Sequence, residues 1–161
     1  MKLVSKIGAT VLFIFIAIQW YRPYKNAQIS SDYADLLISE NAPKEVIALY
    51  RNACYDCHSN YTQYAWFDNI APISWYVDSN IKEGKFVLNF SNWKNLTVIE
   101  KEIMFQAIPF DIDQEKMPKK KYTLFHPKAT LSEENKQTMI AWLALVKTRF
   151  LSNEGADQTQ D

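Results

Sequence analysis

Both cysteines of this 161-residue chain lie in one five-residue stretch, Cys54-Tyr55-Asp56-Cys57-His58. Cys-x-x-Cys-His is the attachment sequence of c-type haem. Two thiols about one helical turn apart can bond the two vinyl groups of one porphyrin, and the adjacent histidine is then held under the iron. The stretch therefore predicts one covalent haem c, with Cys54 and Cys57 as the thioether attachments and His58 as the proximal iron ligand.

Two other interpretations of this stretch stay open. A Cys-x-x-Cys pair is also a thiol redox motif, but such a motif usually opens a helix after a β-strand, whereas an amphipathic helical pattern precedes this pair. Structural zinc needs four ligands, which Cys54, Cys57, His58 and His126 supply in number. The adjacent Cys57 and His58 would then have to bind the same ion. We favour the haem over both.

The second axial ligand must come from elsewhere in the chain, and cytochromes c typically use methionine, which raises the reduction potential. Met117 lies in the charged segment Glu115-Lys116-Met117-Pro118-Lys119. A core methionine would have nothing to pack against there, whereas a ligand needs a backbone stiffened by proline. We therefore predict Met117 as the distal iron ligand.

Three other side chains compete with Met117 for this role. Met104 and Met139 lie beside the apolar stripes of expected helices, so packing in the core explains both. His126 is the rival nitrogen ligand, but between Phe125 and Pro127 it is more typical of a turn or of a hydrogen-bond donor to a haem propionate.

An apolar run over residues 7–21 follows Lys2 and Lys6 and ends before Arg22. A cleaved signal peptide has small residues after its apolar core, whereas residues 19–24 here are bulky. We expect an uncleaved transmembrane or signal-anchor helix through residues 7–21. As with most signal anchors, the N-terminus is then cytoplasmic and the remainder exported.

Composition narrows the remaining classes of fold and partner. The chain carries 18 Lys and Arg against 18 Asp and Glu, so it lacks the basic excess of a nucleic-acid binder. Three glycines are too few for a glycine-rich phosphate-binding loop or for a β fold with glycine at most of its turns. We therefore predict an all-α fold, with no nucleic acid among the partners of the protein.

Helical periodicity places the elements of this fold. We expect a helix from about Pro43 into Cys54, a short helix near Pro72 and a third from the N-cap Ser91 that Pro109 bounds. The last helix is expected to begin around residues 130–132, with a capping box from Thr130 to Glu133. Residues 109–127 are expected to form a long ordered loop. The expected organisation is an anchor at 1–25, a linker or arm at 26–42, the haem domain at 43–151 and a polar tail at 152–161. The first and last helices of the haem domain should pack together, and the Met117 loop should close the distal side.

A wider set of motifs resembles a known family, the haem-binding-domain family of small bacterial membrane-anchored c-type cytochromes. These motifs are residues 52–60 around Cys-x-x-Cys-His, 66–75 with Ala71-Pro72-Ile73-Ser74-Trp75, Asn89-Phe90-Ser91-Asn92-Trp93, Met117-Pro118, Tyr122-Thr123-Leu124, His126-Pro127, Leu131-Ser132 and Ala141-Trp142. The resemblance covers about residues 43–146. Residues 108–114 look longer than the usual connection into the Met-Pro motif.

The resemblance implies an all-α, cytochrome c-like monohaem domain that faces the periplasm and is anchored in the bacterial inner membrane. It assigns the thioethers to Cys54 and Cys57, the proximal ligand to His58 and the distal ligand to Met117. The expected function is one-electron transfer rather than catalysis. If the sixth iron position is open or labile, a peroxidase-like enzyme or a sensor of diatomic gases is the alternative. Redox partner proteins are expected to dock near Lys119, Lys120 and Lys121.

Overall fold

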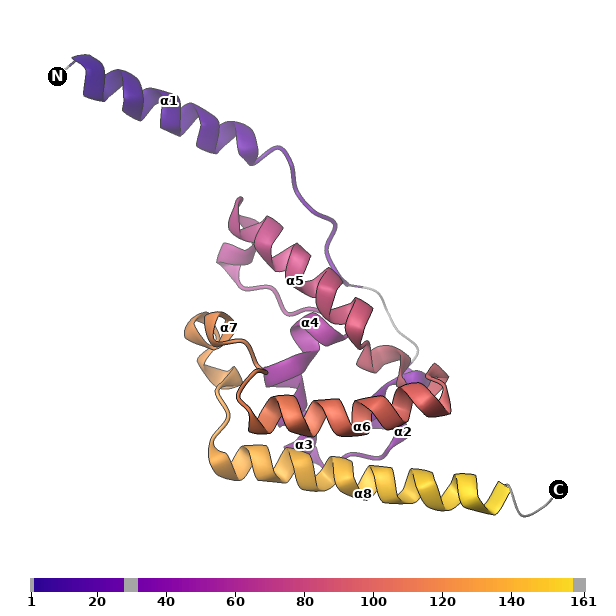
Figure 1. Ribbon diagram of the computed structural model, residues 1–161. Coiled ribbons are helices and arrows are strands. Elements are labelled where there is room, and N and C mark those ends of the chain that lie inside the picture. The colour runs from indigo at the N-terminus through magenta and orange to yellow at the C-terminus, as the bar shows by residue number, and fades with distance from the viewer. Residues whose placement is uncertain (1, 28–31, 158–161) are drawn as a thin grey trace.

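A computed structural model describes residues 2–27 and 32–157 of the chain (Figure 1). In these residues the structure contains helices and a single isolated bridge between Ala27 and Tyr61, with no β-strand. The prediction of an all-α fold is thus confirmed. The α-helices are α1 (Lys2–Ile18), α2 (Leu36–Ser39), α3 (Lys44–Tyr50), α4 (Asp56–His58), α5 (Ile73–Val87), α6 (Val98–Asp113), α7 (Lys120–Phe125) and α8 (Glu133–Asp157). The shorter turns are the π-helical η2 (Arg51–Tyr55) and the 3₁₀ segments η1 (Asp32–Ala34), η3 (Trp66–Asn69), η4 (Phe90–Asn95) and η5 (Pro127–Ala129).

The core lies where α3, α6 and α8 meet, and α6 runs alongside α8 (Figure 1). Tyr50 at the end of α3 is fully buried against Trp142 of α8, with ring centroids 5.4 Å apart, and its hydroxyl donates to the Met139 carbonyl. Each large apolar side chain buried in this way contributes about 1.5–3 kcal/mol. The expected contact between the first and last helices of the haem domain is confirmed.

The core also reaches into the segment expected to be a linker or arm. Leu36 and Leu37 of α2 are fully buried in the same cluster as Tyr50. Asp35 caps this short helix, because its carboxylate accepts the Leu37 N–H. The packed domain therefore includes residues before 43.

Three expectations for the middle of the chain are corrected. Ser91 does not cap the third helix: it lies in η4, and the N-cap of α6 is Thr97, which forms a capping box with Glu100. Pro109 lies inside α6 and does not end it. A proline inside a helix costs about 3 kcal/mol, but α6 continues because the burial of Ile108 and Ile112 on either side offsets this cost. Residues 109–127 are not one long loop, since they contain the end of α6 and the whole of α7.

Two further helices also differ from the sequence-based prediction. The helix after Pro72 is α5, which is 15 residues long rather than short. The last helix begins at Glu133 and is capped by Ser132, whose hydroxyl accepts the Asn135 N–H, instead of by Thr130. It continues to Asp157, so residues 152–157 are helical; the rest of the expected polar tail lies outside the described residues.

Helix α1 extends away from the domain (Figure 1), and its residues from Lys2 to Ala17 are exposed. Its end is tied to α5 and the segment before it, because the Gln19 side chain makes two hydrogen bonds to the Ala71 backbone and the Trp75 indole donates to the Tyr21 carbonyl. Among the described residues, no helix combines the length and the apolar character needed to cross a membrane.

Candidate functional site

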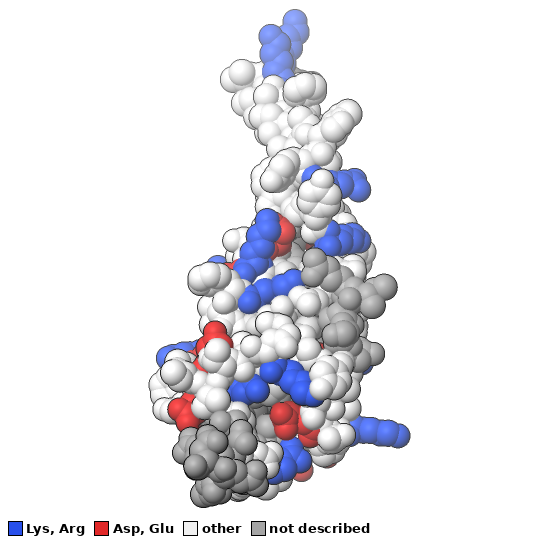
Figure 2. All heavy atoms as spheres, turned by 90° about the vertical axis from the view of Figure 1, so that its right-hand side faces the viewer, with Lys and Arg blue, Asp and Glu red and all other residues white. Residues whose placement is uncertain are grey.

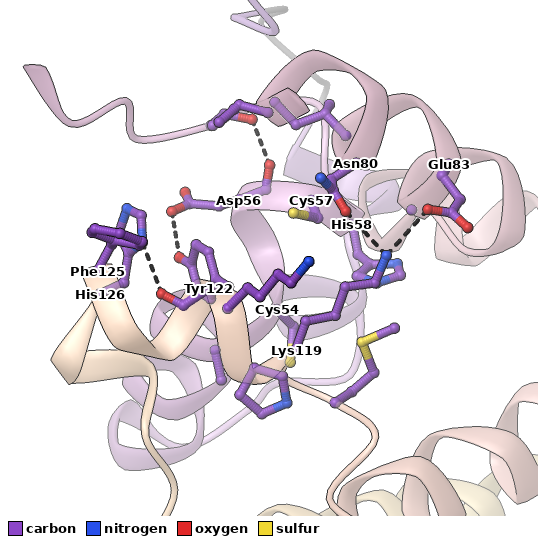
Figure 3. A pocket seen from close by; sticks show the side chains of 18 of the residues that line it. Cys54, Asp56, Cys57, His58, Asn80, Glu83, Lys119, Tyr122, Phe125 and His126 are labelled. Carbon is purple, nitrogen blue, oxygen red and sulfur yellow. Dashed lines mark hydrogen bonds and ion pairs between the residues drawn. The ribbon is translucent and has the colours of Figure 1, made fainter. Parts of the chain in front are cut away.

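A cavity of about 1000 Å³ opens between the Cys-x-x-Cys-His segment, α5, α6 and α7, and its lining is predominantly apolar. The residues that the sequence singled out all line it: Cys54, Cys57, His58, Met117 and His126. Figure 3 shows the labelled side chains around the cavity, with Cys54, Cys57 and His58 on one side and Tyr122, Phe125 and His126 on the α7 side.

The two cysteines lie on consecutive turns of one continuous helical stretch. Cys54 belongs to η2 and Cys57 to α4, and both thiols are free and half-buried. Burial raises the pKa of Cys54 to about 12, with a further rise from Cys57, and it raises the pKa of Cys57 to about 11. Both thiols are therefore protonated at neutral pH. A dithiol redox protein needs a lowered thiol pKa, and burial of these two thiols acts in the opposite direction.

A backbone carbonyl orients the His58 ring. Its Nδ1 lies 3.1 Å from the carbonyl oxygen of Leu88, just after α5. The neutral tautomer with a proton on Nδ1 donates this hydrogen bond and leaves Nε2 as a lone-pair donor. Burial lowers the pKa of His58, which favours that neutral form. This is the arrangement of an imidazole prepared to ligate a metal.

Met117 lies in the short connection between α6 and α7 and is half-buried in the cavity lining. The Lys116 and Met117 N–H groups both donate to the Asp111 carbonyl, at 2.9 and 3.0 Å, which fixes the chain as it leaves α6. Two residues after Met117, the Lys119 ammonium donates to Asn80 and Glu83 of α5 (Figure 3). The connection is therefore held to α6 at its start and to α5 near its end.

Met104 and Met139, the two methionines considered as alternatives to Met117, lie in different surroundings. Met139 is fully buried in the core, as expected. Met104 is half-buried, packs against the core and also lines the cavity from α6. The cavity thus contains two thioether sulfurs, one on a helix and one on a connection.

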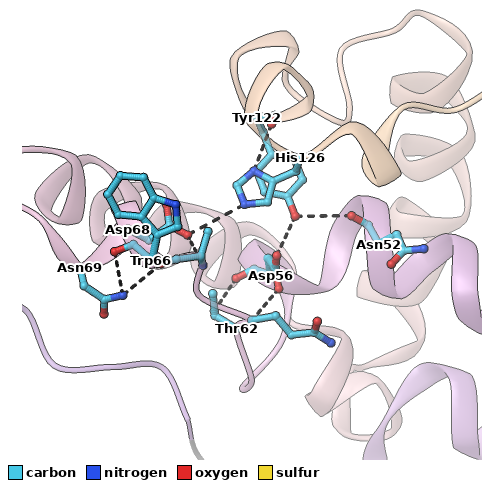
Figure 4. A network of polar contacts seen from close by, with 10 residues as sticks. Asn52, Asp56, Thr62, Trp66, Asp68, Asn69, Tyr122 and His126 are labelled. Carbon is cyan, nitrogen blue, oxygen red and sulfur yellow. Dashed lines mark hydrogen bonds and ion pairs between the residues drawn. The ribbon is translucent and has the colours of Figure 1, made fainter.

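Sequence reasoning missed a polar network at one side of the cavity (Figure 4). The Tyr122 hydroxyl donates to Asp56 Oδ2 at 2.6 Å, and its ring stacks on His126 with centroids 4.2 Å apart. His126 Nδ1 lies 3.2 Å from the Tyr122 carbonyl, and its Nε2 lies 3.9 Å from the buried carboxylate of Asp68. These contacts join the Cys-x-x-Cys-His segment to α7 and place His126 at the edge of the cavity. No local sequence signal pairs these residues, because they lie on separate elements.

The zinc interpretation is not supported. No three His, Cys, Asp or Glu side chains in residues 2–27 and 32–157 lie close enough together to hold a metal ion. His126 is instead engaged with Tyr122 and Asp68, away from a shared site with the two cysteines.

The residues present fit a haem. The cavity has the size and apolar lining that a planar macrocycle requires. Two thiols and an oriented imidazole lie on its wall, and sulfur ligands are available from Met117 and Met104. Trp66 and Phe125 are exposed at the same cavity, so its rim is aromatic.

Comparison with known proteins agrees with this geometry. The haem-binding domain family matches residues 13–145, which is most of the chain and includes the cavity-lining residues. No significant match was found among curated proteins or among solved structures. The family match, together with Cys54, Cys57 and His58 on the wall of an apolar cavity, shows that this chain belongs to the haem-binding domain family.

Proposed function

We propose that the protein is a c-type cytochrome that transfers single electrons and does not catalyse a reaction. The observation that carries the proposal is the placement of Cys54, Cys57, His58 and Met117 on one apolar cavity. When bound there, a haem supplies an iron that changes reversibly between the ferric and ferrous states. The proposal includes one haem, attached covalently.

Each residue has a distinct part in this proposal. Cys54 and Cys57 would hold the haem through thioether bonds, which would prevent its loss. Leu88 holds the His58 ring so that Nε2 is the nitrogen presented as the proximal ligand. Met117 is the distal ligand, and its connection is fastened by Asp111 before it and by Lys119 after it. Two protein ligands held in this way leave little to rearrange when the charge changes.

We further propose that α1 directs the domain to a membrane and that the domain faces the periplasm of a bacterium. Support comes from the long row of apolar side chains that α1 exposes, among them Leu12, Phe13 and Ile14, with only Lys2 and Lys6 as charged residues. The experiment is separation of membranes from soluble proteins in a host with a c-type haem attachment system. The proposal requires the haem protein to sediment with the membranes, and recovery of the haem protein in the soluble fraction contradicts it.

Redox partners are proposed to dock at Lys119, Lys120 and Lys121, at the start of α7. All three side chains are exposed, and Lys119 and Lys121 also line the cavity. An acidic partner surface placed there would lie close to the bound group. Exchange of Lys120 and Lys121 for Gln should slow electron transfer to an acidic partner most at low salt, and an unchanged salt dependence contradicts this site.

The experiment that tests the main function is a visible spectrum of the exported protein with denaturing haem staining. The proposal expects haem that stays on the chain in denaturant, a low-spin ferrous spectrum, and bands that do not change under CO. Cys54→Ser/Cys57→Ser should lose the denaturant-resistant stain. Rapid CO binding by the wild type would instead favour the peroxidase-like or gas-sensing alternative, and absence of covalent haem would overturn the proposal.

A further inference from the structure

A second hollow lies on the domain where the chain arrives from α1. It has a volume of about 390 Å³ and lies between residues 24–26 and the C-terminal half of α5. The residues that line it are Tyr24, Lys25, Asn26, Asp78, Ile81, Lys82, Lys85, Phe86 and Asn89. We call this hollow the basic groove, and none of its residues except Ile81 belongs to the haem cavity.

The charge of the groove is predominantly positive. Lys25, Lys82 and Lys85 line it, and Asp78 is the acidic residue among the lining side chains. Asp78 accepts from Lys82 at 2.7 Å, and Lys85 donates to the neutral Asn26 side chain at 2.9 Å. Lys25 and Lys85 therefore have no carboxylate partner among the residues that line the groove. Figure 2 shows Lys and Arg side chains gathered where α1 joins the domain, with few acidic atoms among them.

Two aromatic side chains that line the groove, Tyr24 and Phe86, extend into solvent, and so does Trp20 after the end of α1. Tyr24 is 98 % exposed, Phe86 is 92 % exposed and Trp20 is 87 % exposed. Exposure this high means that these rings contribute almost nothing to the packing of the domain. Aromatic rings beside lysines are typical of the region where a protein meets lipid headgroups.

The groove is also held at a fixed place relative to α1. The Gln19 side chain is bound to the Ala71 backbone, and Trp75 of α5 donates to the Tyr21 carbonyl at 2.9 Å. These contacts bring the end of α1 against the start of α5, whose later turns carry Lys82, Lys85 and Phe86. Tyr24 and Lys25 follow Tyr21 by three and four residues, so at most about 10–14 Å of chain separates the groove from the point at which the end of α1 is held.

We propose that the basic groove binds the anionic phospholipid headgroups of the membrane that α1 enters, so that the domain lies on the lipid with this face. The proposal rests on the membrane contact of α1 proposed above. Positive charge matches anionic lipid, and the exposed rings of Tyr24 and Phe86 enter the interface beside it. The α5 face that carries the groove is then turned toward the membrane.

The test is acetylation of lysines in the full haem-loaded chain, quantified by mass spectrometry. The protein is compared on vesicles of phosphatidylcholine alone and on vesicles that also contain phosphatidylglycerol. Lysines near an anionic surface gain roughly 1 kcal/mol each, which corresponds to about 5-fold. We expect acetylation of Lys82 and Lys85 to slow by about 5-fold on the anionic vesicles, whereas the exposed Lys44 and Lys128, which do not line the groove, react equally on both.

A pair of variants with the same loss of charge completes the test. Lys25→Gln/Lys85→Gln, which removes the two lysines without a carboxylate partner in the groove, should lower the preference of the protein for anionic over neutral vesicles by about 30-fold in a flotation assay. Lys44→Gln/Lys128→Gln should leave that preference unchanged. Failure to float with either kind of vesicle would contradict the membrane contact of α1. If the protein floats with both kinds of vesicle but Lys82 and Lys85 are acetylated equally on both, the proposal that the groove binds anionic headgroups is wrong, whereas the membrane contact of α1 stands.

Discussion

Gly84 of α5 lies so close to Cys57 that a Cβ atom on it would be 2.6 Å from the Cys57 carbonyl oxygen and 3.2 Å from the Cys57 Cβ. The nearest atom belongs to the backbone, so it cannot move away by a change of rotamer as the end of a flexible side chain can. Absence of a side chain at position 84 is therefore what allows α5 to approach the Cys-x-x-Cys-His segment. Since His58 is bound to Leu88 just beyond α5, this contact also sets the orientation of the imidazole.

Gly84→Ala should push α5 away from α4 and disturb the placement of Cys57 and His58. Overpacking of this kind costs about 1–3 kcal/mol, which outweighs the gain in helix propensity of about 1 kcal/mol. We expect a lower yield of covalently attached haem and a lower free energy of unfolding in urea. Gly8→Ala is the matched control, because nothing among the described residues lies within 4 Å of a Cβ there. Equal haem yields in the two variants would contradict the role given to Gly84.

The two cavity methionines are distinguishable by substitution. Met117→Ala should abolish the absorption that arises from sulfur bound to ferric iron, lower the reduction potential and allow CO to bind the ferrous form. Met104→Ala removes a residue packed on the core, so it should lower stability by about 2–5 kcal/mol and preserve that absorption. The measurements are a ferric spectrum, a redox titration and urea unfolding of both variants. Loss of the absorption in Met104→Ala alone would assign the distal position to Met104.

Lys119 should hold the Met117 connection against α5 without contributing much to stability. Its ammonium lies 3.1 Å from Glu83 and 3.0 Å from Asn80, but the Lys119 and Glu83 side chains are both exposed, and such ion pairs contribute about 0–1 kcal/mol. Lys119→Met should therefore change the free energy of unfolding by less than about 1 kcal/mol. It should also raise the population with Met117 displaced by up to about 5-fold, so that CO changes the ferrous bands of the variant while those of the wild type stay unchanged. Lys120→Met is the control. An equal response to CO in the two variants would show that Lys119 does not hold the Met117 connection in place.

The parts of the site that lie close together in sequence could be predicted from it. Cys54, Cys57 and His58 line the cavity, as the motif indicates, because their spacing alone places them on adjacent helical turns. Met117 lines it too, because a methionine with only charged neighbours has no core of its own to join. The contact of Tyr50 with Trp142 follows from apolar periodicity in the first and last helices of the domain.

The features of the fold and the site that could not be predicted depend on contacts between elements far apart in the sequence. Hydrophobic periodicity carries no information on such contacts. A proline ordinarily indicates the end of a helix, but tertiary burial of Ile108 and Ile112 carries α6 past Pro109. Asp56 occupies a variable position of the motif, and its bond to Tyr122 forms only when α7 folds over the cavity. Gly84 looks like a weak point in a helix until the backbone of Cys57 is placed against it.

Asp35 joins α2 to the cysteine-bearing segment through one buried carboxylate. Its Oδ1 accepts from the Leu37 N–H and from the Tyr55 hydroxyl, each at 2.9 Å. Asp35→Ala removes the helix cap and leaves the buried Tyr55 hydroxyl without its acceptor, which together should cost about 2–4 kcal/mol in the free energy of unfolding. Asp35→Asn retains an oxygen at the same place and should avoid most of this loss. If urea unfolding shows that the two variants are equally destabilised, Asp35 does not stabilise the fold through these two hydrogen bonds.

The same residue should make stability depend on pH. Burial raises the pKa of Asp35 above its ordinary value of 3.8, against the lowering effects of the Tyr55 and Leu37 hydrogen bonds and the Arg51 charge. A carboxyl with a raised pKa in the folded state contributes stability that is complete below pH 3.8 and is lost as pH rises through the folded-state pKa. Because the amide introduced by Asp35→Asn cannot ionise, the free energy of unfolding of that variant should rise relative to wild type over this interval and then stay level at higher pH. Urea titrations at a series of pH values measure the difference. A difference that falls as pH rises would show that the charged carboxylate stabilises the fold.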